Sequence, residues 1–113
     1  MVTREAERRP YATWALSRIH ERAMRGSVRY GGTRVQLDVD NLGLNVDDVC
    51  ECLATLEESC FQHSERYAAD GPWNDVYRRL WAPAGRAPDD LYIKLRLDRG
   101  CLTITLCSFH QSR

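Results

Sequence analysis

The sequence lacks several of the patterns that mark common protein classes. No apolar run approaches the about 18 residues of a membrane-spanning helix, and residues 1–10 are charged, without the apolar core of a secretory signal. The five cysteines are odd in number and lack the paired C-x2-C spacing of zinc sites. We therefore expect free thiols in a reducing, cytoplasmic compartment, and no metal site. The G-x-x-x-x-G-K-[ST], G-x-G-x-x-G and H-E-x-x-H motifs are also missing, so nothing indicates a nucleotide, dinucleotide or zinc cofactor.

The chain also lacks net charge, because 16 basic residues balance 16 acidic ones. The charges are nevertheless unevenly distributed. Residues 1–35 carry eight arginines and three acids (net +5), residues 36–75 carry ten acids and one arginine (−9), and residues 76–113 carry seven basic residues and three acids (+4). Fifteen of the basic residues are arginine, which suits bidentate phosphate recognition, although a GC-rich genome produces the same bias. A neutral total therefore does not exclude a nucleic-acid-binding surface.

The length of 113 residues fits one domain. Residues 1–10 show no apolar periodicity, so we expect a flexible basic arm there and a single domain over residues 11–113. Apolar residues at helical spacing predict a first helix from Tyr11 to Arg25. The stretch 28–40, which contains two adjacent glycines, fits a short hairpin or strand pair.

A second helix is predicted to begin after Asn45, which is a suitable N-cap, and to run to about Leu56. Further along, Val76 to Trp81 is strand-like, and residues 82–90, rich in proline and glycine, form a loop.

The last segment has the clearest pattern, because apolar and polar residues alternate from Leu91 to Leu97. A tight turn at Arg99-Gly100 would start a second strand over residues 101–109 and complete a C-terminal hairpin. A two-residue turn sets the following opposed pairs: Leu97 with Leu102, Leu95 with Ile104 and Ile93 with Leu106 on the core face, and Arg96 with Thr103, Lys94 with Thr105 and Tyr92 with Cys107 on the solvated face.

Two segments resemble a known family. Trp73-Asn74-Asp75-Val76-Tyr77-Arg78 and Tyr92-Ile93-Lys94-Leu95 are similar to the W-x-D-V-Y-R and Y-[LI]-K-[ILV] elements of the motility quorum-sensing regulator toxins, MqsR. The earlier Leu42-Gly43-Leu44 and the segment from Leu56 to Phe61 match the order and spacing of that family as well. The resemblance is colinear over about residues 11–109.

The MqsR family is similar to the RelE-type bacterial toxins. The resemblance therefore implies an α+β fold: a small antiparallel sheet that ends in the C-terminal hairpin, flanked by two or three helices. It also implies an mRNA interferase of a type II toxin–antitoxin module, which cleaves mRNA without a metal and is neutralised by a cognate antitoxin.

The resemblance also implies a set of catalytic residues. The family's lysine after the L-x-E-S-x-F segment corresponds to His63, its glutamine in W-Q-D-V-Y corresponds to Asn74, and its active-site tyrosine is Tyr92. The lysine that closes the last strand corresponds to Cys107 by the hairpin register, or to His110 by the terminal S-F-K pattern. The second assignment needs three extra residues or a bulge.

These residues suit RNA cleavage. Histidine titrates near neutral pH, so it serves as a general base or acid better than an unperturbed lysine. We expect proton transfer by His63, with His110 as a second candidate, and substrate binding by Arg78, Lys94, Arg96 and, in the alternative register, Cys107. Tyr92 can donate a hydrogen bond or stack on a base, and the Asn74 amide can read a base edge or orient the phosphate.

Two other functions remain open at this point. Substitutions at three of the four family positions can have ended cleavage and left an RNA- or protein-binding relative. Alternatively, the acidic residues between Asp38 and Asp75 form the main surface of a protein-interaction module. Toxicity on induction, rescued by an antitoxin, would distinguish these from an active toxin.

Overall fold

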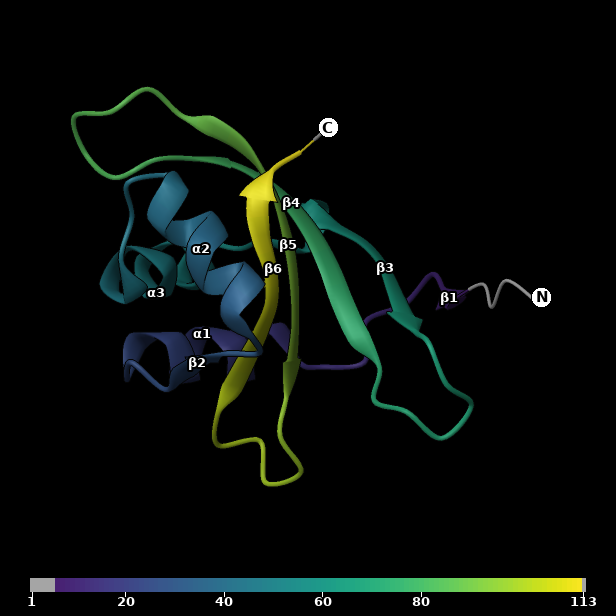
Figure 1. Cartoon of the computed structure of the whole chain (residues 1–113). Coiled ribbons are helices and arrows are strands. Elements are labelled where there is room, and N and C mark those ends of the chain that lie inside the picture. The colour runs from purple at the N-terminus through teal and green to yellow at the C-terminus, as the bar shows by residue number, and fades with distance from the viewer. Residues whose placement is uncertain (1–5, 113) are drawn as a thin grey trace.

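The computed structural model describes residues 6–112 and has an α+β fold, as predicted (Figure 1). The described residues form a six-stranded sheet of order β1-β3-β4-β5-β6-β2, in which only the β2–β6 pair is parallel. The elements are β1 (Glu7–Arg9), α1 (Leu16–Met24), β2 (Val28–Tyr30), α2 (Thr33–Asn41), α3 (Val46–Ala54), a 3-10 turn (Glu58–Cys60), β3 (Phe61–Arg66), β4 (Asn74–Trp81), β5 (Asp89–Leu97) and β6 (Ile104–Gln111).

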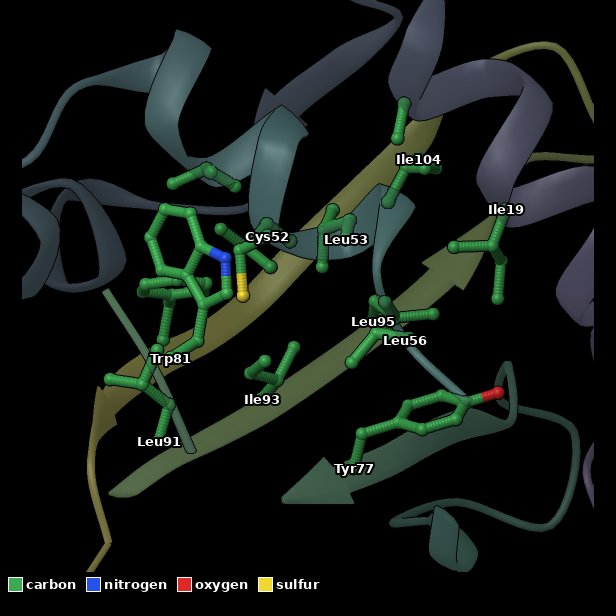
Figure 2. Close-up of a cluster of buried hydrophobic side chains, with 14 of the residues drawn as sticks. Ile19, Cys52, Leu53, Leu56, Tyr77, Trp81, Leu91, Ile93, Leu95 and Ile104 are labelled. Atoms are coloured by element: carbon green, nitrogen blue, oxygen red, sulfur yellow. The ribbon is translucent and has the colours of Figure 1, made fainter. Parts of the chain in front are cut away.

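The three helices cover one face of the sheet and enclose a single core. In β5 the buried residues alternate with half-buried ones, so one set of side chains points into the core and the other away from the helices. Figure 2 shows Ile93 and Leu95 of β5 packed with Leu53 and Leu56, which lie in and just after α3. Because the three helices lie on one face, the other face of the sheet is free of helices among residues 6–112, and we call it the open face.

None of the helices in residues 6–112 has the length and apolar character that a membrane crossing needs.

The two predicted helices form, with one change of boundary. Helix α3 begins after Asn45 as expected, and a capping box in which Asn45 and Asp48 bond each other's backbone N–H fixes its start. Helix α1 starts at Leu16 rather than at residue 11. The Asp75 carboxylate accepts the backbone N–H groups of Thr13 (3.0 Å) and Trp14 (2.9 Å), and this contact holds the preceding segment against β4.

The hairpin or strand pair expected over residues 28–40 is wrong. Only Val28–Tyr30 is a strand, β2, and it pairs in parallel with β6, while Thr33–Asn41 forms helix α2. Val35 and Val39, four residues apart, are the buried residues of α2. A strand would place Leu37 on the same side as these two residues, whereas Leu37 is 56% exposed, so the burial pattern follows the helical period.

Residues Glu7–Arg9 differ from the expected flexible arm, because they form β1 along the edge of β3 (Figure 1). Contacts with residues far along the chain hold them: Glu7 pairs with Arg66, and the Arg9 guanidinium lies over the ring of Trp73 at 3.9 Å from its centroid. The local pattern of residues 1–10 does not reveal these distant partners, which is why it predicts a flexible arm. Residues 1–5 of that predicted arm lie outside the described residues.

The C-terminal hairpin forms, but its strand pairing differs from the predicted one. At the end far from the turn the difference is three residues. The loop between Asp98 and Thr103 is wider than a two-residue turn, since the Asp98 carboxylate accepts the Leu102 N–H at 2.8 Å and Cys101 adopts φ +54°. This shifts the register by two residues, so Leu97 faces Ile104.

A bulge adds the third residue. Leu95 faces Leu106, whereas Lys94 faces Ser108, so Cys107 is the extra residue of β6. The pairs predicted from a tight turn are therefore wrong. Beyond the bulge Tyr92 faces His110, which is the arrangement that the terminal S-F-K pattern required.

Candidate functional site

The open face carries most of the predicted site residues. Cross-strand partners point to the same side of a sheet, so the registers define which side chains meet there. One row across β3, β4, β5 and β6 consists of His63, Val76, Lys94 and Ser108. A second row places Arg78, Tyr92 and His110 side by side. Five of the eight predicted site residues are in these rows. The other three, Asn74, Arg96 and the bulge residue Cys107, contact one another.

A buried carboxylate that the sequence analysis did not single out joins these residues. The Glu65 side chain is only 4% exposed, although it lies on the open face. Its Oε1 lies 2.7 Å from His63 Nε2, and its Oε2 accepts the Tyr67 hydroxyl and lies 3.5 Å from Lys94 Nζ. Arg8 of β1 approaches the same carboxylate at 3.9 Å. An imidazole, a phenol and an ammonium therefore converge on one ionised group.

The environment keeps this cluster charged. Burial alone would raise the pKa of Glu65, but the hydrogen bonds from Tyr67 and His63 and the nearby Lys94 charge outweigh it, so the pKa is lowered. Burial acts to lower the pKa of Lys94, yet its hydrogen bond to Tyr67 (2.9 Å) and the Glu65 charge raise it overall. At neutral pH the carboxylate is ionised and the ammonium is protonated.

Tyr92 sits beside this cluster and keeps its proton. Burial and the charge of Glu65 raise its pKa, and Lys94 and Arg8 offset only part of that increase. Its ring stacks on the imidazole of His110, with centroids 5.2 Å apart and planes 15° from parallel. The stack borders a pocket of about 420 Å³ that is also lined by Arg34, Asp38, Cys107, Ser108 and Ser112.

A third group lies at the other end of the open face. Arg96 Nη1 donates to Asn74 Oδ1 at 3.1 Å and lies 3.1 Å from Cys107 Sγ. Arg29 of β2 donates to Thr105 Oγ1 at 3.0 Å. Burial raises the pKa of Cys107, so its thiol is neutral. Asn74 is therefore held by an arginine, with its amide fixed in orientation.

The two candidate histidines lie far apart on the face. His63 is on β3 and His110 on β6, and three strand spacings of about 4.8 Å separate their backbones by about 14 Å. His63 contacts the Glu65 cluster, whereas His110 stacks on Tyr92 beside the pocket. Arg78, at the edge of the face, is paired with Asp90 at 2.5 Å. Within residues 6–112, no three His, Cys, Asp or Glu side chains are grouped as metal ligands.

Comparison with known families agrees with the motifs. The family model described as motility quorum-sensing regulator, toxin of MqsA, matches residues 11–111. The chain belongs to the MqsR toxin family. Toxins of this family have an antitoxin partner, so an antitoxin is implied for this chain as well. No curated protein sequence matches the chain significantly.

The MqsR motif W-x-D-V-Y contributes mainly structure here. Asp75 is fully buried and holds the segment before α1, and Tyr77 is buried in the core, where burial raises its pKa well above that of a free tyrosine. Asn74, the residue before Asp75, points to the open face, where its amide oxygen accepts from Arg96. The spacing of two between His63, Glu65 and Tyr67, in β3 and just after it, was the available signal for the cluster. That spacing indicates a site only once the position of Lys94 is known.

Proposed function

We propose that this protein is an endoribonuclease of a type II toxin–antitoxin module, which cleaves mRNA by metal-independent acid–base chemistry and is neutralised by a cognate antitoxin. The observation that carries the proposal is the pairing of His63 with the buried Glu65 carboxylate, beside the Lys94 ammonium, on the open face. Membership of a toxin family supports it. An mRNA substrate would place the activity in the cytoplasm.

His63 acts as the general base. Glu65 lacks a proton at neutral pH, so the imidazole Nε2 must carry the hydrogen in their 2.7 Å contact, and Nδ1 is left as the proton acceptor. A carboxylate that fixes an imidazole tautomer and stabilises the imidazolium is the arrangement used in serine hydrolases. In the proposed reaction, Nδ1 takes the proton of an RNA 2′-hydroxyl, whose oxygen then attacks the adjacent phosphorus.

Lys94 and Tyr92 act on the phosphate. The raised pKa of Lys94 keeps its ammonium charged, which favours stabilisation of the extra negative charge on the pentavalent phosphorus over proton transfer. The Tyr92 hydroxyl, also with a raised pKa, remains a hydrogen-bond donor, and in the proposed reaction it protonates the departing 5′-oxygen. The products are a 2′,3′-cyclic phosphate and a 5′-hydroxyl end.

His110 takes a different part in this scheme from the one the sequence suggests. About 14 Å of backbone separation keeps it from sharing the phosphate with His63. Its stack on Tyr92 next to the 420 Å³ pocket instead suits a nucleobase that extends the stack. Arg78 and Arg96, at either side, bind neighbouring phosphates of the RNA. Asn74 orients the RNA strand between those phosphates.

The proposal is tested with purified protein and single-stranded RNA in the presence of a chelator. We expect fragments with 2′,3′-cyclic phosphate ends, and His63→Ala to lower the cleavage rate by about 10²- to 10⁴-fold. His20→Gln is the matched control, because His20 Nε2 bonds the Leu56 carbonyl oxygen (2.6 Å) away from the open face. It should cleave normally, and circular dichroism checks that both variants fold.

Three outcomes separate the possibilities. Unchanged cleavage by His63→Ala would remove His63 from the mechanism. RNA binding without cleavage by the wild-type protein would identify an inactive RNA-binding relative. In cells, induction should stop growth, and co-expression of the cognate antitoxin should restore it; growth without any effect on mRNA would contradict the proposal as a whole.

A further inference from the structure

Strand β1 lies outside the segment that matches the family, which begins at residue 11. It consists of three residues and pairs antiparallel with β3, the strand that carries His63 and Glu65 (Figure 1). Glu7 faces Arg66, Arg8 faces Glu65 and Arg9 faces Ser64. The strand therefore extends the sheet by one position on the side next to the proposed general base.

The two outer residues of β1 are anchored on the face opposite to the site. Glu7 bonds the Arg66 guanidinium at 3.0 Å. Arg9 donates to Thr13 Oγ1 at 2.6 Å, and its guanidinium lies over the Trp73 ring at 3.9 Å. The cation–π contact, the hydrogen bond and the ion pair together hold a segment that pairing over three residues alone would not fix.

This anchoring determines where the middle residue points. Side chains alternate along a strand, so with Glu7 and Arg9 on the anchored face, Arg8 must project onto the open face. Its side chain is 66% exposed, and its guanidinium reaches Glu65 at 3.9 Å. Among residues 6–112 the Arg8 guanidinium has this contact with Glu65 and donates no side-chain hydrogen bond, so its five donors can serve a further ligand.

We propose that β1 is part of the RNA-binding surface, with Arg8 as a ligand for a substrate phosphate next to the one that is cleaved. This inference rests on the proposed ribonuclease function and assigns a further substrate-binding residue to it. A planar guanidinium with free donors suits a phosphate that has two non-bridging oxygens. Arg8 does not touch the reacting atoms in this scheme, so it contributes to substrate affinity rather than to the chemical step.

Binding is measured by fluorescence anisotropy with a 2′-O-methyl RNA oligonucleotide, which lacks the nucleophile and cannot be cleaved. The dissociation constant is determined at several salt concentrations for wild-type protein, Arg8→Ala and Arg8→Lys. Loss of one phosphate contact should lower the slope of log K against log salt by about 0.7 for single-stranded RNA. We expect Arg8→Ala to weaken binding about two- to five-fold and Arg8→Lys to restore most of the slope.

Arg25→Ala is the matched control, because it removes the same charge from an exposed arginine at the end of α1, in the helical layer. It should leave the slope unchanged. In cleavage assays Arg8→Ala should raise KM and keep kcat within about two-fold. Circular dichroism verifies that the variant retains its fold, as expected when both anchors stay in place.

The outcomes distinguish this inference from the proposed function. If wild-type protein neither binds nor cleaves RNA, the proposed function fails first. If wild-type protein binds RNA and Arg8→Ala has the same salt slope and affinity, or if Arg25→Ala reduces both equally, the role of Arg8 is wrong while the ribonuclease proposal stands.

Discussion

Replacing Glu65 by glutamine tests whether the buried carboxylate acts through its charge. Glutamine has nearly the same shape, but its amide presents one acceptor oxygen where the carboxylate presents two. In the wild-type protein these oxygens serve His63, Tyr67 and Lys94. Hydrogen bonds to a charged group contribute about 1.5–3 kcal/mol each, and one at least is lost. We expect the free energy of unfolding to fall by about 2–4 kcal/mol at pH 5.5, which corresponds to about 8–16 °C in Tm.

The effect should depend on pH in a defined direction. The pKa of Glu65 is lowered in the folded protein, so its charge contributes stability at pH values above the unfolded pKa, about 4.3. That contribution is lost as the pH falls through the folded-state pKa. The difference in unfolding free energy between wild type and Glu65→Gln should therefore be complete at pH 5.5 and shrink towards pH 3.

Urea denaturation followed by circular dichroism at a series of pH values measures this difference. Glu51→Gln, the same change at an exposed position of α3, is the control and should alter stability by less than about 0.5 kcal/mol. A difference for Glu65→Gln that stays constant from pH 5.5 to pH 3 would refute the reasoning, because the cost would then come from packing and not from the ionised carboxylate.

Two further predictions concern buried residues outside the site. Asp75→Asn should lower the free energy of unfolding by about 2–3 kcal/mol in thermal or urea melts, since the carboxylate accepts the backbone N–H groups of Thr13 and Trp14; an unchanged melt would show that this contact is dispensable. Burial raises the pKa of Cys52 to about 12, so iodoacetamide at pH 8 should leave Cys52 unmodified in the native protein, by mass spectrometry, while the half-exposed Cys101 reacts; equal labelling of the two would contradict the burial of Cys52.

The sequence allowed the elements with strong local signals to be predicted. The N-cap at Asn45 and the alternation in β5 depend on residues close together in the chain, and both predictions are confirmed. The register of the hairpin was wrong because it depends on the Asp98 side chain in the loop and on the bulge at Cys107. A turn with a side-chain acceptor and a bulge both leave the apolar alternation of each strand intact, so the pattern alone does not reveal them.

The site was predicted in part for a similar reason. His63 and Tyr92 could be named from the family resemblance, and Lys94 from its position on the polar face of the hairpin. The structure brings the three to one face. Glu65 could not, because a glutamate on a strand resembles an ordinary surface residue until its cross-strand neighbours are known. Its 4% exposure results from side chains that arrive from β5 and β1. Its burial therefore depends partly on residues far away in the sequence, which the local pattern does not reveal.

The order of the strands has a consequence for how the chain folds. The first thirty residues supply both edges of the sheet: Glu7 in β1 pairs with Arg66, and Val28 in β2 pairs with Ile104. The four strands between them are joined in succession, so they can pair as soon as they leave the ribosome. Until the N-terminal strands dock, the borders of β3 and β6 expose unpaired backbone groups that can join another chain. The segment synthesised first is thus the one that ends the period in which the folding chain is most prone to aggregate.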